Sequence, residues 1–204
     1  MNYLYERRRE MLGAKIQRLP WEYQEVEYLE VGGTRGPYIK TGQSNQTGDT
    51  IIITLCILAY DIDSRMWGGL SPNSELDVYL NKFRFDIENP NTMKYYYSIN
   101  EKYTIEKKEG KWYINGSYIQ NAVDPNCDFQ AYLFARNYAQ YPQTVNKAVY
   151  LRIYKYTHKR GRTLLVEFVP CYRKSDNKPG MYDLVTKQFF TNAGTGDFTL
   201  GPNV

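Results

Sequence analysis

Hydrophobic and polar residues alternate with period two over most of this chain, which is the spacing of half-buried β-strands. The alternation begins after Pro20 and predicts ten strands, at residues 26 to 31, 50 to 60, 76 to 87, 92 to 99, 111 to 114, 117 to 120, 128 to 135, 147 to 157, 163 to 172 and 181 to 190. The run TIIITLCILAY, residues 50 to 60, is apolar on both faces and predicts a central strand. Strands in this number without intervening helices predict an all-β fold, a two-sheet sandwich of jelly-roll type.

Turn residues mark where consecutive strands connect. Asn115 and Gly116 separate two alternating runs and predict a type I′ hairpin, whose two central residues both need positive φ. Residues 159 to 162 close a second hairpin, and residues 175 to 180 form a longer turn. Because His158 stands directly before the second hairpin turn, we expect it to be an exposed turn residue without a catalytic triad to join.

The N-terminal residues follow a different pattern. Asn2 and Gly13 are typical capping residues, and a broken apolar stripe between them predicts a short amphipathic α-helix. The first 20 residues carry five basic and two acidic side chains, whereas the other 184 carry 21 and 20. We therefore divide the chain into an N-terminal helical anchor arm, residues 1 to 18, and a β-sandwich domain, residues 19 to 204. A helix this short is marginal alone in water, so we expect the arm to dock on another chain through Tyr3, Leu4, Tyr5, Arg7, Arg8, Arg9, Met11 and Leu12.

Composition favours contact surfaces over acid/base chemistry, because the chain has 21 tyrosines and a single histidine. No stretch reaches about 18 apolar residues and the start lacks the apolar core of a secretory signal, so we expect no membrane insertion and synthesis in the cytoplasm. The sandwich is nearly neutral and shows no basic stripe, so we expect no nucleic-acid partner. Cys56, Cys127 and Cys171 lie far apart and are expected to be free thiols.

Two stretches at the ends of the sandwich carry a family resemblance. They are LPWEYQEVEYLEVGGTRGPYIKTG, residues 19 to 42, and EFVPCYRKSDNKPGMYDLVTKQFFTNAGTGDFTLGP, residues 167 to 202. They resemble the opening and closing strands of concanavalin A-like, laminin-G-like jelly rolls, which recur in surface proteins of gut bacteria and in virion proteins of their phages. The resemblance spans residues 19 to 202. It implies a concanavalin-like fold and a role in attachment or display, and it brings no catalytic residues.

From these features we expect a structural protein of a phage virion, a head fibre or capsid decoration, rather than an enzyme. The helical arm would fasten the chain to capsid or other virion proteins, and the sandwich would be displayed outward, toward a host-surface glycan. A symmetric homo-oligomer, a trimer, would bury the apolar stripe of the arm near its axis. A bacterial carbohydrate-binding surface module is the alternative, and a laminarinase-like glycoside hydrolase is a third class.

Carboxylates supply candidate sites that the expected function does not use. Glu75 and Asp77 resemble the start of a laminarinase-type signature, but Tyr79 stands in the third place, so the leaving group would have no acid. Two further groups offer oxygens of the kind that calcium prefers, namely Asp61 with Asp63, and Asp124 with Asn126 and Asp128. We expect these to be capping or solvated groups, and we expect no cofactor and no metal.

Aromatic residues supply the remaining candidate. Tyr95 and Tyr97 share one face of a predicted strand, whereas Tyr96 points to the other face. One face can then belong to the core while the other serves as a platform on which sugar rings stack. Tyr95 and Tyr97 are the candidate glycan platform, with ordinary cross-strand packing as the alternative.

Overall fold

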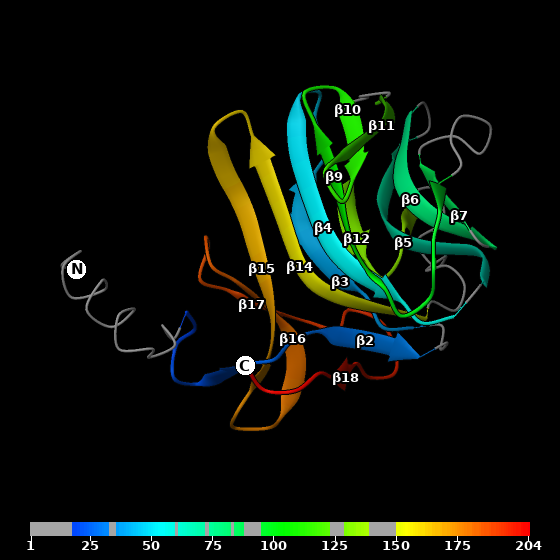
Figure 1. The fold of residues 1–204 in the computed structure, drawn as a ribbon. Helices are drawn as coiled ribbons and strands as arrows, with labels where there is room; N and C mark the ends of the chain where they lie inside the picture. The colour runs from blue at the N-terminus through cyan, green and yellow to red at the C-terminus, as the bar shows by residue number, and fades with distance from the viewer. Residues whose placement is uncertain are drawn as a thin grey trace, which may run out of the picture.

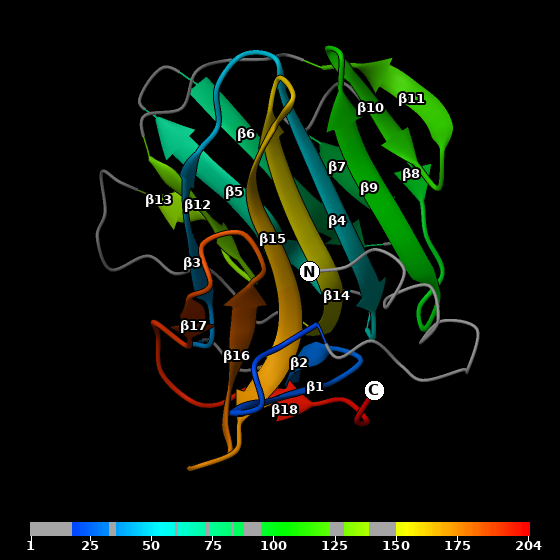
Figure 2. The ribbon, with the colours of Figure 1, turned by 90° about the vertical axis from the view of Figure 1, so that its left-hand side faces the viewer.

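The computed structural model describes residues 18 to 32, 36 to 59, 61 to 71, 74 to 82, 84 to 87, 95 to 122, 129 to 138 and 150 to 204. Within these ranges the chain forms two β-sheets that pack face to face (Figure 1). Figure 2 looks onto the larger sheet, with the second sheet behind it. The predicted all-β sandwich is confirmed, whereas the predicted N-terminal helix lies outside the described residues. No helix in the described ranges has the length and apolar character needed to cross a membrane.

The larger sheet has the strand order β11-β10-β9-β4-β14-β15-β16-β17, with β2 also beside β14, β18 beside β2, and β1 beside β15. All of its pairings are antiparallel. Its strands are β1 (Tyr23–Glu25), β2 (Leu29–Gly32), β4 (Asp49–Ile57), β9 (Lys102–Lys108), β10 (Lys111–Ile114), β11 (Ser117–Asn121), β14 (Tyr150–Arg160), β15 (Thr163–Arg173), β16 (Lys178–Asp183), β17 (Phe189–Thr191) and β18 (Thr199–Leu200).

The second sheet has the order β3-β12-β5-β6-β7-β8, and β13 runs parallel beside β5. Its strands are β3 (Ile39–Ser44), β5 (Asp61–Ser71), β6 (Ser74–Lys82), β7 (Arg84–Ile87), β8 (Tyr95–Tyr96), β12 (Gln130–Leu133) and β13 (Asn137–Tyr138). The parallel contact is short, so both sheets are essentially antiparallel.

The main core fills the space between the two sheets. Alternate residues of β4 point into it, and the predicted central strand is confirmed because β4 pairs with β9 on one edge and β14 on the other. The larger sheet contributes Leu55, Tyr156 and Phe168, and the second sheet contributes Ile39 and Trp67, all fully buried. Burial of each such side chain stabilises the fold by roughly 1.5 to 3 kcal/mol relative to exposure.

A smaller cluster lies on the opposite face of β15 and β16. Val169 and Cys171 alternate with the core residue Phe168 along β15, so they point away from the main core. Leu19 and Tyr182 complete this cluster. The segment that enters the sandwich at Leu19 therefore packs directly on the outer face of the larger sheet.

The turn predictions agree with the structure. Asn115 and Gly116 have φ values of 50° and 78°, as a type I′ turn demands. The second hairpin is also present, but its turn is shorter than expected, because Arg160 still pairs with Thr163. β14 therefore extends through His158, which is completely buried. The prediction that His158 is an exposed turn residue is wrong for this reason.

Some predicted strands are broken or shortened. The strand expected at residues 181 to 190 is interrupted because the Asp183 carboxylate accepts hydrogen bonds from the backbone N–H groups of Val185 and Thr186. The strand expected at residues 128 to 135 ends at Leu133, because Phe134 takes a φ of 65°. The strand expected at residues 76 to 87 is two strands, β6 and β7, which pair with each other.

Candidate functional site

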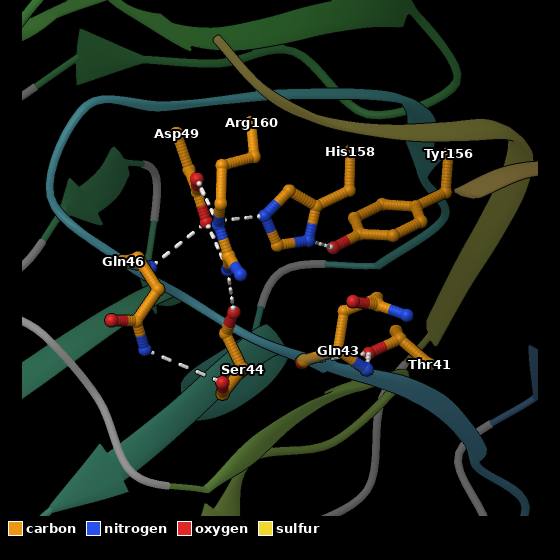
Figure 3. Close-up of polar contacts among 8 residues, drawn as sticks. All are labelled: Thr41, Gln43, Ser44, Gln46, Asp49, Tyr156, His158 and Arg160. Carbon is orange, nitrogen blue, oxygen red and sulfur yellow. Dashed lines mark hydrogen bonds and ion pairs between the residues drawn. The ribbon is translucent and has the colours of Figure 1, made fainter. Parts of the chain in front are cut away.

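A group of buried polar side chains lies where the β14–β15 hairpin meets the start of β4 (Figure 3). Asp49 is the first residue of β4 and pairs with Arg160, near the end of β14. Tyr156, His158 and Arg160 are two residues apart on β14, so their side chains share one face. Strand register therefore brings all four residues together, and we call them the Asp49 network.

Asp49 is the centre of this network. Its Oδ2 accepts a hydrogen bond from His158 Nε2 at 2.7 Å and from the Gln46 backbone N–H at 2.8 Å. Arg160 donates from Nε to Oδ1 and from a terminal nitrogen to Oδ2, both at 3.0 Å, which is a bidentate pair. The same guanidinium donates to the Ser44 carbonyl at 3.1 Å. These contacts fasten the β3–β4 connection to the β14–β15 hairpin.

Burial and hydrogen bonding act on the titrating groups in opposite directions. Burial acts to raise the pKa of Asp49, but the hydrogen bonds from Arg160, His158 and Gln46 outweigh it and hold that pKa below its usual range. Burial lowers the pKa of His158, and the upward pull of Asp49 is too weak to restore it. The network therefore contains a neutral imidazole that donates from Nε2 to an ionised carboxylate.

The other ring nitrogen of His158 faces Tyr156. Because Nε2 carries the proton, Nδ1 accepts from the Tyr156 hydroxyl, across a long 3.5 Å. Burial raises the pKa of Tyr156, so this hydroxyl stays protonated. Asp49, His158 and Tyr156 are all fully buried, and only Arg160 reaches solvent, with 46% of its side chain exposed. In this conformation the network rigidifies the sandwich, and no dissolved molecule can touch its imidazole.

Further polar groups lie buried in the sandwich. Lys107 is fully buried and pairs with Ile51, which itself pairs with His158 on the other side of β4. Within the described part of the chain, the amide of Asn45 and the indole nitrogen of Trp67 are buried without a hydrogen-bond partner. Buried polar groups of this kind are commonly satisfied by internal water. The interior is thus polar in places, which the period-two pattern does not reveal.

The predicted docking residues of the arm, Tyr3, Leu4, Tyr5, Arg7, Arg8, Arg9, Met11 and Leu12, lie outside the described residues. The same holds for Cys127, Asp124, Asn126 and Asp128. Backbone alone is described for Asp61 and Asp63 in β5 and for Glu75, Asp77 and Tyr79 in β6. Cys56 and Cys171 are free and buried. Within the described ranges, no three His, Cys, Asp or Glu side chains are grouped to hold a metal ion.

The three consecutive tyrosines alternate as the pattern predicts. Tyr97 is only 5% exposed and Tyr95 packs against the core, with its ring 6.3 Å from that of Tyr103. Tyr96 is 72% exposed. The face that carries Tyr95 and Tyr97 is the core face, so their rings are not presented for stacking on a sugar.

A different pair of tyrosines is presented to solvent. Tyr113 and Tyr118 are paired across the Asn115–Gly116 hairpin on the outer face of the larger sheet, and Tyr118 is 55% exposed. Sequence reasoning missed this pair, although its signal was available. Trp112 and Ile114 point inward, so a two-residue hairpin turn places Tyr113 opposite Tyr118 on the outward face.

The residues that carry the family resemblance support the fold. The Asp183 carboxylate accepts four hydrogen bonds from the backbone and side chains around it. The Asn192 side chain binds the backbone N–H of Tyr38 at 3.1 Å and the carbonyl of Gly196 at 2.7 Å. A Cβ atom on Gly194 would lie 1.8 Å from the Gly36 carbonyl oxygen. These residues close the last strands onto residues 36 to 38.

Comparison with known proteins adds little. No family model matches the chain, and no curated protein matches it. Among solved structures, the chain is similar to a Trypanosoma rangeli sialidase in complex with 2,3-difluorosialic acid, described as a covalent intermediate. The identity is 10% and the TM-score 0.43, over 66% of this chain and 30% of the sialidase chain. This chain therefore corresponds to under a third of that enzyme's length.

This match corrects one expectation. We expected the chain not to be an enzyme, and the similar solved structure is that of an enzyme, so the expectation is withdrawn. A likeness with a TM-score below 0.5 carries no argument for any particular activity.

Proposed function

We propose that this chain is a structural component of a phage virion, a head fibre or capsid decoration, which displays a concanavalin-like β-sandwich for attachment. The resemblance of residues 19 to 42 and 167 to 202 to jelly rolls of gut bacteria and their phages supports this proposal. The two-sheet architecture is compatible with it.

The observation that carries the proposal is the exposure of large aromatic side chains on a rigid sandwich. Trp21, Tyr96 and Tyr118 expose 75%, 72% and 55% of their surface. Aromatic rings with a polar tip are enriched at recognition surfaces, because they bury much area and lose little conformational entropy.

The anchor arm supplies the second half of the proposal. Its basic residues suit an acidic docking surface on capsid or other virion proteins, and its apolar stripe suits packing of identical copies around an axis. A trimer displayed in this way would present its sandwiches outward, toward a host-surface glycan. At the junction, Arg18 forms an ion pair with Glu25 of β1 and Leu19 packs under the same strand, so the arm begins at a fixed point of the sandwich.

The test is incorporation into particles. A chain that starts at Leu19 is compared with the full chain and with the variant Arg7→Gln, Arg8→Gln, Arg9→Gln, which keeps the length of the arm. We expect the full chain to be located on purified particles by cryo-electron microscopy. The truncated chain melts cooperatively near the temperature of the full chain and is absent from particles. Light scattering on the purified full chain checks the trimer.

Two results would overturn the proposal. One is incorporation of the truncated chain at the level of the full chain. The other is location of the chain on the surface of a bacterial cell and on no particle, which would favour a bacterial carbohydrate-binding surface module.

A further inference from the structure

The outer face of β9, β10 and β11 carries two tyrosine rings whose planes are steeply inclined to each other. We call this pair of rings, Tyr113 and Tyr118, the corner. Tyr113 and Tyr118 are paired across the hairpin, with ring centroids 6.1 Å apart and planes at 72°. The strand register shifts between Trp112 and Tyr113, an irregularity of the kind that re-aims side chains beside functional sites. β11 is the end strand of the larger sheet among the described strands (Figure 2).

Hydrogen-bonding groups surround the corner. Lys108 Nζ lies 4.9 Å from the centroid of the Tyr113 ring and 3.1 Å from Glu106 Oε2. The Tyr118 hydroxyl donates to Asn121 Oδ1 at 3.2 Å. The corner thus combines apolar ring faces with an ammonium, a carboxylate and an amide, which is the mixture that a sugar needs for its C–H faces and its hydroxyl groups.

Two other tyrosines of the larger sheet and its connections, Tyr154 and Tyr28, have cations over their rings. The Lys102 ammonium lies 3.8 Å from the centroid of the Tyr154 ring, and the Arg152 guanidinium lies 4.4 Å from that of Tyr28. For Tyr118, the contacts found within the described ranges are an edge contact with Tyr113 and a bond from its hydroxyl. Among the described residues, no cation lies over the Tyr118 ring, which is 55% exposed.

We infer that Tyr113 and Tyr118, with Glu106, Lys108 and Asn121, form a binding subsite for an uncharged hexose unit of a glycan. This inference rests on the proposed attachment function and names its ligand class. The sugar ring stacks on Tyr118, and its hydroxyl groups bond to the Glu106 and Lys108 side chains. Because this ammonium and this carboxylate neutralise each other, the corner has no preference for an acidic sugar.

The charge of the surrounding hairpin agrees with an uncharged ligand. Lys111, which pairs with Lys108, and Glu109 in the connecting turn add one further charge of each sign.

Calorimetric titration tests the inference with defined probes. The uncharged probes are dextran, mannan and β-1,3-glucan oligosaccharides, and alginate is the acidic probe. We expect the full chain to bind at least one uncharged probe. Tyr118→Ala should weaken that binding about tenfold, the loss expected for one stacked aromatic contact. Tyr118→Phe keeps the ring and should bind within a few fold of the unchanged chain.

Matched controls separate the subsite from general effects. Tyr150→Ala removes a tyrosine that is 40% exposed on β14, four strands away from β11 in the same sheet, and it should leave the affinity unchanged. Thermal melting checks that each variant folds. Glu106→Gln, which keeps the size of the side chain, should weaken binding without changing the melting temperature.

The outcomes are distinct from those of the particle test. Equal affinity of Tyr118→Ala and the unchanged chain, binding of alginate alone, or no binding of any probe at millimolar concentration would each overturn the subsite. If the chain is found in particles and none of the uncharged probes binds, this inference fails while the proposed function stands. If Tyr118 is needed for glycan binding and the chain is absent from particles, the proposed function fails instead.

Discussion

Asp49 offers the sharpest test of how the sandwich is held together. The change Asp49→Ala removes the acceptor for the fully buried His158 Nε2 and for the Gln46 backbone N–H. It also frees Arg160, whose side chain is 46% exposed and can therefore be rehydrated at little cost. Each buried donor left without a partner costs about 1 to 3 kcal/mol, and the change leaves two such donors, His158 Nε2–H and the Gln46 N–H. We expect a loss of about 4 kcal/mol in the free energy of unfolding.

The assay is urea unfolding followed by tryptophan fluorescence, because Trp67 and Trp112 are buried and report the loss of the core. For a domain of this size the same loss lowers the melting temperature by about 12 °C. Asp49→Asn keeps the shape and one oxygen and should lose about half as much. The control Asp197→Ala removes a carboxylate that is 77% exposed and should change stability by less than about 0.5 kcal/mol. Equal stability of Asp49→Ala and the control would refute this account of the network.

Two further predictions concern the imidazole and the closing turn. Burial holds the pKa of His158 below its ordinary value near 6.5, so the folded state binds this proton less readily than the unfolded chain. Its contribution to stability is complete above about pH 6.5 and is lost as the pH falls from there through the folded pKa. Proton NMR of the single histidine should therefore show a midpoint below 6.5, and a midpoint above 6.5 would contradict a neutral His158 imidazole. Gly194→Ala should destabilise the fold by about 3 kcal/mol, because its Cβ would clash with the Gly36 carbonyl. Gly32→Ala, where a Cβ meets nothing within 4 Å, is the matched control, and similar melting of the two variants would contradict the prediction.

The sequence alone predicted an element correctly where its burial pattern and its turn residues indicate the same structure. The Asn115–Gly116 hairpin and the central strand β4 follow from positive φ in the turn and from an apolar run, and the structure has both. The strand β9 was not predicted, because one of its inward positions is occupied by Lys107. A charged residue at an inward position breaks the period-two pattern, and only the tertiary structure shows that it is buried.

The candidate site was harder to predict, because it depends on contacts between distant segments. His158 and Asp49 lie 109 positions apart, and nothing local to either residue indicates that they meet. Lys159 and Arg160, which follow His158 directly, favoured a solvent-exposed turn. The structure overrides this because β14 continues to Arg160, which places the imidazole on the inward face. Tyr113 and Tyr118, in contrast, could have been paired from the hairpin alone.

The closing residues that carry the resemblance lie far from Tyr113 and Tyr118 in the larger sheet. Gly180, Asp183, Asn192 and Gly194 all serve to fold β16, β17 and the final turn onto the sandwich. These strands form one end of the larger sheet, whereas β11 with Tyr118 forms the other end. Outward residues of β10 and β11 can therefore change without disturbing the packing that the closing residues maintain. The resemblance carried by these closing residues therefore bears on the fold, and the glycan subsite that we infer lies at the opposite edge of the sheet.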